Sequence, residues 1–324
     1  MRRVLGSLSL VLLICLMGSV AVSAAGWPTK EVEIVVPWAA GGATDMVFRA
    51  ISTVFPKHAN GQPLIIKNIP GGGAVPGTME FLKGRPDGYT LLGIATPIIT
   101  KIHMSEVPFD TDSFAPVIMV VENPCIIMVP ADSPYQNLNE FVDAAKANPG
   151  KVSIGNGGAG GGTHLVALAF ENHVGAEFLH VPFGGGGPSV TAAVGGHVDS
   201  INVSAPEGFT NVDAGQLRIL GVLGEERLER FPDAPTALEQ GIDFSMAMWR
   251  GVAAPAGTPD DLIKTIHDIF LACIEDPEFL AQAEDMGLRV VHFNPEQFAE
   301  YIESESQAYE ELCKTKGLGD RYTK

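Results

Sequence analysis

Three glycine-rich segments contain the residues of this sequence that are best suited to hold a ligand. Residues 37–45, 155–164 and 183–189 each come directly after or at the end of an apolar run, and each passes into a helix-forming stretch. Glycine lets the backbone approach a ligand closely, and the N–H groups of a helix's first turn have no partner in the helix and carry partial positive charge. The segments therefore predict backbone sites for the negative groups of a small molecule, formed without lysine or arginine.

Several side chains in these segments allow two interpretations. Asp45 is placed to bind a ligand, or to favour the start of a helix and pair with Arg49 four residues later. His164 lies just inside the second helix start, where its ring either donates to a bound anion or caps its own turn. Trp38 and Phe183 either wall a cleft or belong to the core. The residues alone leave these alternatives open.

Motifs of cofactor and metal sites receive little support. Residues 155–160 match G-x-G-x-x-G, but the next expected strand ends in Val181-Pro182 and lacks the acidic residue of a dinucleotide site. Residues 184–187 lack the lysine of a phosphate-binding P-loop, and the eight histidines show no metal-binding spacing. We therefore expect no cofactor and no metal.

Catalysis has one candidate arrangement. An exported hydrolase would use His164 with a nearby serine such as Ser153 or Ser204. The sequence contains no G-x-S-x-G nucleophile turn, which counts against this alternative. We expect a binding protein without catalytic residues.

Residues 1–25 have the pattern of a secretory signal peptide: a short basic start, an apolar run and a small-residue cleavage site ending at Ala25. We therefore expect an exported, periplasmic protein. Without the two arginines of that segment the chain has a net charge of −19, which argues against a nucleic-acid partner. Cys125, Cys273 and Cys313 remain and lie in apolar patterns, so we expect buried thiols, with a disulfide as the alternative.

Strand and helix patterns alternate along the rest of the chain. The expected helices cover residues 44–55, 76–82, 138–147, 163–173, 188–194 and 262–275, and the expected strands cover 64–67, 89–95, 117–121, 126–129, 200–203 and 218–223. Asn137 and Glu140 have capping-box spacing, and Pro188 is expected at the first position of its helix. This alternation predicts parallel sheets with helices on both faces, and the lack of a linker predicts two interleaved domains.

The sequence resembles the substrate-binding proteins of tripartite tricarboxylate transporters, also called Bug proteins. The motifs that carry the resemblance follow one another along essentially the whole mature chain: residues 37–45 (PWAAGGATD), 68–73 (NIPGGG), 86–91 (PDGYTL), 147–151 (ANPGK), 162–164 (GTH), 180–183 (HVPF), 195–199 (GGHVD), 249–251 (WRG) and 254–259 (APAGTP).

The resemblance implies a two-lobed α/β fold of the type II periplasmic-binding-protein class, in which each lobe is a mostly parallel sheet flanked by helices. We expect residues 26–124 and 249–324 to form lobe one and residues 125–248 to form lobe two. The lobes would close about a hinge, and a side chain at Gly161 would obstruct closure.

The resemblance also implies a small organic carboxylate as ligand, held between the lobes by main-chain N–H groups and ordered waters. The candidate contacts are Trp38, Ala40, Gly41, Gly42, Asp45, Thr96, Gly160, Gly161, Gly162, Thr163, His164, Phe183 and Ser204. The implied role is that of a monomeric receptor, not an enzyme, which delivers its solute to the membrane components of such a transporter. A receptor that signals to a sensor kinase is the alternative.

Two positions depart from the family pattern. Gly184 stands where many members have a lysine, and His164 follows a threonine directly, whereas relatives often space the histidine further. Both departures concern ligand contacts, so the identity of the solute stays open.

Overall fold

The computed structural model describes residues 26–320, so the expected signal peptide lies outside the described residues. In this part the strands are β1 Val32–Val36, β2 Leu64–Asn68, β3 Thr90–Ala95, β4 Phe114–Pro130, β5 Ser153–Asn156, β6 Leu179–Pro182, β7 Ser200–Ser204, β8 Leu217–Val222, β9 Ala247–Pro255 and β10 Arg289–Phe293. The α-helices are α1 Ala43–His58, α2 Val75–Phe81, α3 Thr96–Met104, α4 Leu138–Ala147, α5 Gly162–Val174, α6 Gly186–Val194, α7 Phe209–Asp213, α8 Asp260–Ile274, α9 Pro277–Asp285 and α10 Pro295–Lys316.

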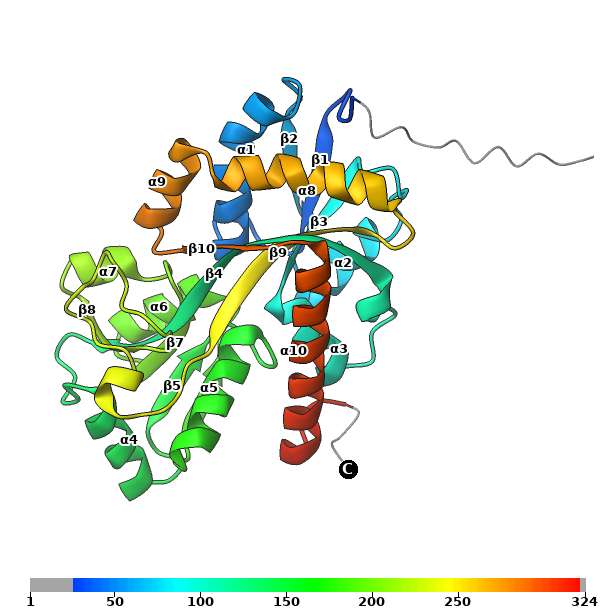
Figure 1. The fold of residues 1–324 in the computed structure, drawn as a ribbon. Helices are drawn as coiled ribbons and strands as arrows, with labels where there is room; N and C mark the ends of the chain where they lie inside the picture. Colours follow the sequence, from blue (N-terminus) through cyan, green and yellow to red (C-terminus); the bar gives the residue numbers. More distant parts are fainter. Residues whose placement is uncertain (1–25, 321–324) are drawn as a thin grey trace, which may run out of the picture.

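Two long strands, β4 and β9, connect the halves of the molecule. In Figure 1 they run diagonally from the part that holds α1, α2 and α8 to the part that holds α4 to α7. β4 pairs with β9 over residues 114–124 and then with β7 and β8 over residues 125–130. The chain therefore crosses between two α/β halves along continuous strands. The lobe boundaries expected from the sequence stay a prediction.

Each half has a mixed sheet, which corrects the expectation of mostly parallel sheets. β2, β1 and β3 are parallel, as are β6, β5 and β7. The pairs that involve β4 are antiparallel, and so is the pair of β3 with β9. The difference arises because strands that cross between the halves in opposite directions must pair antiparallel.

Two further expectations about elements are wrong. Residues 117–121 and 126–129 belong to one strand, because Asn123 and Pro124 keep the pairing with β9 and the Pro124 carbonyl accepts from Ala205 N–H at 3.2 Å. Helix α6 begins at Gly186, so Pro188 is its third residue and not its first. A proline is tolerated there because the first-turn N–H groups have no intrahelical partner.

In the half that contains β1 to β3, the hydrophobic core lies on both faces of the sheet. α1 and α8 pack on one face, where Phe48, Phe55 and Phe270 are fully buried. α3 and α10 cover the other face of the same strands, around Trp249 and Phe298. These layers fix the ends of β1 and β3, from which the first predicted segment and Thr96 emerge.

The cysteines are free and buried, as predicted. Burial raises the pKa of Cys125 and of Cys273 to about 12, so both thiols stay protonated at neutral pH. Cys313 lies 3.5 Å from the Met104 sulfur.

Candidate ligand-binding site

The predicted segments follow the carboxyl ends of parallel strands in both halves. Residues 37–42 join β1 to α1, and residues 157–161 join β5 to α5. Parallel strands end at the same edge of a sheet, so Thr96, which follows β3, lies near the first segment, and Ser204, which ends β7, lies near the second. Two observations bring these edges together: a Cβ on Gly162 would lie 3.3 Å from Pro97, and Arg250 bonds both Thr44 and Ser204.

Asp45 fixes the first segment. Its carboxylate accepts from Gly41 N–H at 2.8 Å, Arg49 Nε at 2.7 Å and Asn68 Nδ2 at 2.9 Å, and the side chain is 1% exposed. The predicted pair with Arg49 is therefore confirmed. Burial raises the pKa of Asp45, but the hydrogen bonds from Arg49, Gly41 and Asn68 outweigh this effect and hold the pKa below its ordinary value. Asp45 thus stays ionised and shapes the loop.

The other residues of the first segment divide between surface and core. Ala40 and Gly41 are exposed, and Gly41 has a φ of +80°, which favours glycine. Gly42 is the N-cap of α1, and its N–H donates to Ala39 O at 3.3 Å. Trp38 packs against the core on both faces of the sheet, as in the second interpretation of that residue.

The second segment is also held by its own groups. Gly157 N–H donates to Thr163 Oγ1 at 2.9 Å, and Gly160 N–H donates to His164 Nδ1 at 3.0 Å. Gly161 N–H donates to Gly158 O at 3.1 Å. The loop N–H groups are thus used within the loop, as at Gly41. In these two segments, the main-chain donors that remain for a ligand are the first-turn N–H groups of α1 and α5, which no intrahelical carbonyl reaches.

His164 caps its own turn and still has a donor. Because Nδ1 accepts the Gly160 N–H, a neutral ring carries its proton on Nε2. Burial, with a smaller effect of His180, lowers the pKa of His164 to about 4, so the ring is neutral at pH 7. The His180 ring lies edge-on at 5.0 Å between centroids. His164 can therefore give a ligand one hydrogen bond but no positive charge.

Two substitutions separate these roles of His164. We expect His164→Asn to retain an acceptor for Gly160 N–H and therefore to leave the melting temperature unchanged. The same variant should weaken carboxylate binding by about 1–3 kcal/mol, because the Nε2 donor is lost. His164→Ala should weaken binding similarly and lower the melting temperature as well. Calorimetric titration and thermal unfolding measure both effects. Unchanged affinity in the asparagine variant would leave His164 with the capping role alone.

The remaining candidates are mostly buried. Thr96 Oγ1 accepts from Trp249 N–H at 3.1 Å, and Thr96 is fully buried. Phe183 packs against Gly155 and Ile201, which agrees with its interpretation as a core residue. Ser204 is 3% exposed, and its hydroxyl accepts from Asn123 Nδ2.

The structure adds a residue that sequence reasoning did not select. Arg250, in the middle of β9, is 3% exposed and donates from Nε to Thr44 Oγ1 at 3.2 Å and from Nη2 to Ser204 Oγ at 3.5 Å. A charged residue within the apolar run of residues 246–254 was the available signal, because buried charges are rare unless paired or functional.

Unsatisfied polar atoms gather around the same region. Arg250 Nη1, Asn123 Oδ1, Asn156 Nδ2 and Asn202 Oδ1 are buried and have no hydrogen-bond partner among the described residues. Asn156 ends β5 and Asn202 lies in β7, and Asn202 Nδ2 donates to Thr163 O at 2.7 Å. Buried polar groups in proteins almost always have partners, so these atoms are candidates for hydrogen bonds to a polar ligand or to water.

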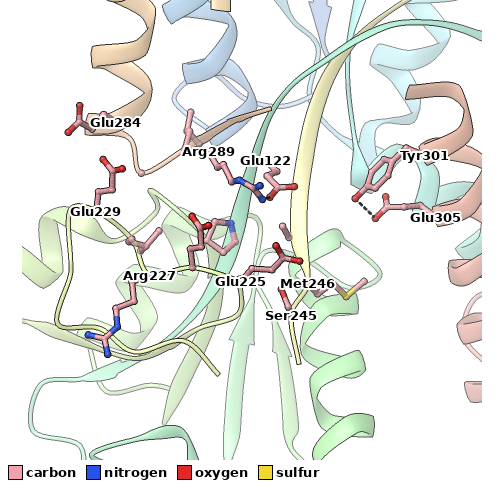
Figure 2. A pocket seen from close by; sticks show the side chains of 17 residues that line it. Glu122, Glu225, Arg227, Glu229, Ser245, Met246, Glu284, Arg289, Tyr301 and Glu305 are labelled. Carbon is pink, nitrogen blue, oxygen red and sulfur yellow. Dashed lines mark hydrogen bonds and ion pairs between the residues drawn. The ribbon is translucent and has the colours of Figure 1, made fainter. Parts of the chain in front are cut away.

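A separate pocket of about 360 Å³ contains none of the predicted contacts. Figure 2 shows it between the loop of residues 224–229 and α10, with Glu122, Glu225, Glu229, Glu284 and Glu305 around it. Arg289 is paired with Glu122 at 2.5 Å, and burial raises the pKa of Glu305 to about 7. An acidic lining disfavours a carboxylate, so this pocket is not our candidate site.

The hydrolase arrangement is not formed in the described residues. Ser153 Oγ donates to Asp199 at 2.6 Å, Ser204 Oγ contacts Asn123, and no hydrogen bond joins His164 to either serine within residues 26–320. The same residues include no group of three or more histidine, cysteine or acidic side chains that could hold a metal ion. Within them, no helix has the length and apolar character needed to cross a membrane.

Known proteins resemble this chain over nearly its whole length. The family described as "Tripartite tricarboxylate transporter family receptor" matches residues 47–318. BugT of Bordetella pertussis is 28% identical over 301 residues, which cover 91% of this chain and 92% of BugT.

Two solved structures of similar proteins contain acids. MatC from Rhodopseudomonas palustris with bound malate has a TM-score of 0.78 and 25% identity, and covers 88% of this chain and 99% of its own. R. palustris Rpa4515 with adipate has a TM-score of 0.83 and 26% identity, and the match covers 90% of this chain and 99% of Rpa4515.

These similarities confirm the resemblance drawn from the sequence motifs and the two-lobed α/β fold. The relatives are receptors that bind a substrate, not enzymes. The chain belongs to the tripartite tricarboxylate transporter receptor family.

Proposed function

We propose that the protein is an exported receptor that binds a small organic carboxylate between its lobes and delivers it to the membrane components of a tripartite tricarboxylate-type transporter. Residues 1–25 would direct export and be removed, and the receptor would act in the periplasm as a monomer. The bound malate of MatC and the adipate of Rpa4515 support the ligand class.

The proposal rests on two contacts between the halves: Arg250 bonds both Thr44 and Ser204, and Gly162 lies beside Pro97. α1 begins beside Thr44 in one half, and α5 begins at Gly162 beside Pro97 of the other half. In this proposal the first-turn N–H groups and the positive dipole ends of both helices face the ligand. Arg250 adds a cation there, so an anion is favoured despite the negative net charge of the chain.

We expect small carboxylic acids to stabilise the folded protein. A ligand at 100 times its dissociation constant adds about 2.7 kcal/mol to the free energy of unfolding, which raises the melting temperature by several degrees. The measurement is a thermal-shift panel of malate, adipate, citrate, benzoate and amino acids on protein refolded after removal of bound ligand.

Glucose and spermidine serve as uncharged and cationic controls for this panel. A receptor of the proposed class responds to one or a few acids and not to the controls. No shift with any acid, on protein that is folded by circular dichroism, would contradict a carboxylate receptor.

A further inference from the structure

Arg250 occupies the point where the two halves and the crossing strands meet. Its backbone is in register with Ala95 at the end of β3 and with Val121 in β4. Its side chain reaches Thr44 in the first turn of α1 through Nε and Ser204 at the end of β7 through Nη2. One guanidinium group thus touches both halves of the molecule.

The outer edge of this guanidinium is left without a partner. A guanidinium has five N–H donors in one plane, and Nη1 with the second hydrogen of Nη2 forms the fork that matches the two oxygens of a carboxylate. In Arg250 the Nη1 atom is buried and has no hydrogen-bond partner among the described residues. The two bonds on the other side hold the fork in a fixed orientation.

No carboxylate of the described residues forms an ion pair with Arg250 within 4.0 Å. Glu207 is the carboxylate whose charge acts on Arg250, and it accepts from Ser204 N–H at 3.2 Å and lies against Gly186 at the start of α6. Burial raises the pKa of Glu207, which weakens its ability to balance the cation. Burial lowers the pKa of Arg250 to about 10, so Arg250 is still charged at neutral pH.

Burying a cation whose N–H donors have no partner destabilises the folded protein unless an anion binds to those donors. The Nη1 donors of Arg250 therefore suit a carboxylate, whereas Asn123 Oδ1, which also lacks a partner beside the shared Ser204 hydroxyl, is an acceptor and suits a hydroxyl or N–H donor of the ligand. Main-chain N–H groups donate to charged and neutral oxygens alike, whereas a fixed guanidinium favours an ionised carboxylate.

We propose that the free fork of Arg250 binds a carboxylate of the solute and is the side chain that selects an ionised acid in this receptor. The assignment rests on the proposed receptor function. It adds a side-chain cation to a site that the sequence predicted to be made of backbone donors, and it couples ligand binding to both halves through Thr44 and Ser204.

The test compares Arg250→Gln and Arg250→Lys with wild type by isothermal titration of malate and adipate. We expect Arg250→Gln to weaken binding by about 10-fold to 100-fold, the range for losing a hydrogen bond to a charged group. Arg250→Lys keeps the charge but not the fork, so its loss should be smaller. Arg227→Gln, on an exposed loop residue paired with Glu239, is the matched control and should bind like wild type.

The outcomes separate this assignment from the receptor function. If wild type binds an acid and folded Arg250→Gln binds it within twofold, the assignment to Arg250 is wrong and the receptor function stands. If no acid binds wild type, both fail. Should Arg250→Gln not fold, a crystal structure of wild type with the acid that binds most tightly decides: a carboxylate oxygen within 3.2 Å of Nη1 supports the assignment, and any other placement overturns it.

Discussion

Valine at position 162 is expected to weaken the binding of every carboxylate by roughly 10-fold to 100-fold. A Cβ on Gly162 would lie 3.3 Å from Pro97 of the opposite half, and 2.5 Å from the Met248 methyl group, which can move aside, so valine crowds the contact between α5 and the opposite half. Overpacking of this kind costs about 1–3 kcal/mol, and each 1.4 kcal/mol changes the dissociation constant tenfold. In the proposed receptor the ligand bridges both halves, so we expect the loss to fall on the closed form.

Gly161→Val, the substitution that the sequence favoured, is a weaker test of closure. Gly161 has a φ of −75°, so a side chain brings no left-handed strain, and its Cβ would face Gly158 O of its own loop at 3.3 Å. We therefore expect a smaller loss of affinity than in Gly162→Val. Ala281→Val is the control, because it places a valine at an exposed position of α9, outside the predicted segments.

Titration calorimetry measures the affinities. Small-angle scattering with and without saturating ligand measures the change in radius of gyration that closure of the two halves would cause. Wild type should show a smaller radius of gyration with ligand than without it, and Gly162→Val should keep the larger value. Wild-type affinity in a folded Gly162→Val variant would show that contact between α5 and the opposite half is not needed for binding.

Local signals predicted individual elements well. The capping-box spacing of Asn137 and Glu140 placed α4 at Leu138–Ala147, and Asn137 Oδ1 accepts Glu140 N–H at 2.9 Å. The pair of Asp45 and Arg49 followed from helical spacing. These features depend only on residues a few positions apart, so the local sequence is enough to predict them.

Features that depend on distant strands were missed. The run from Thr96 to Met104 is rich in β-branched residues and contains Pro97, yet it is helical because it packs against α10 and the sheet. β4 was divided at Pro124 because its continuity depends on β9, more than 100 residues later. Arg250 contacts Thr44, 206 positions away, and no local pattern indicates that neighbour.

The free energy of unfolding should fall by about 2–3 kcal/mol in Asp45→Ala at pH 7. The substitution removes the acceptor of Gly41 N–H, Arg49 Nε and Asn68 Nδ2 from a side chain that is 1% exposed. Hydrogen bonds to a charged group contribute about 1.5–3 kcal/mol each, but the Arg49 side chain is 53% exposed, so its share is discounted for solvent screening. The loop of residues 37–42 would also lose the contact that orders it, which should weaken ligand binding.

This effect has a defined pH dependence. The pKa of Asp45 is lower in the folded than in the unfolded protein, so its stabilisation is fully present above the unfolded pKa of about 3.9 and is lost as the pH falls through the folded pKa. Urea unfolding at pH 7 and at lower pH should therefore show a gap between wild type and Asp45→Ala that narrows in acid.

Asp268→Ala is the matched control for Asp45→Ala. Asp268 also pairs with a cation four positions away on one helix, Lys264, but its side chain is 54% exposed. An exposed pair contributes about 0–1 kcal/mol, so this variant should unfold nearly like wild type at each pH. If Asp45→Ala behaves like Asp268→Ala, the network around Asp45 does not hold the first segment, and the order of that loop must come from the packing of Trp38 and α1 instead.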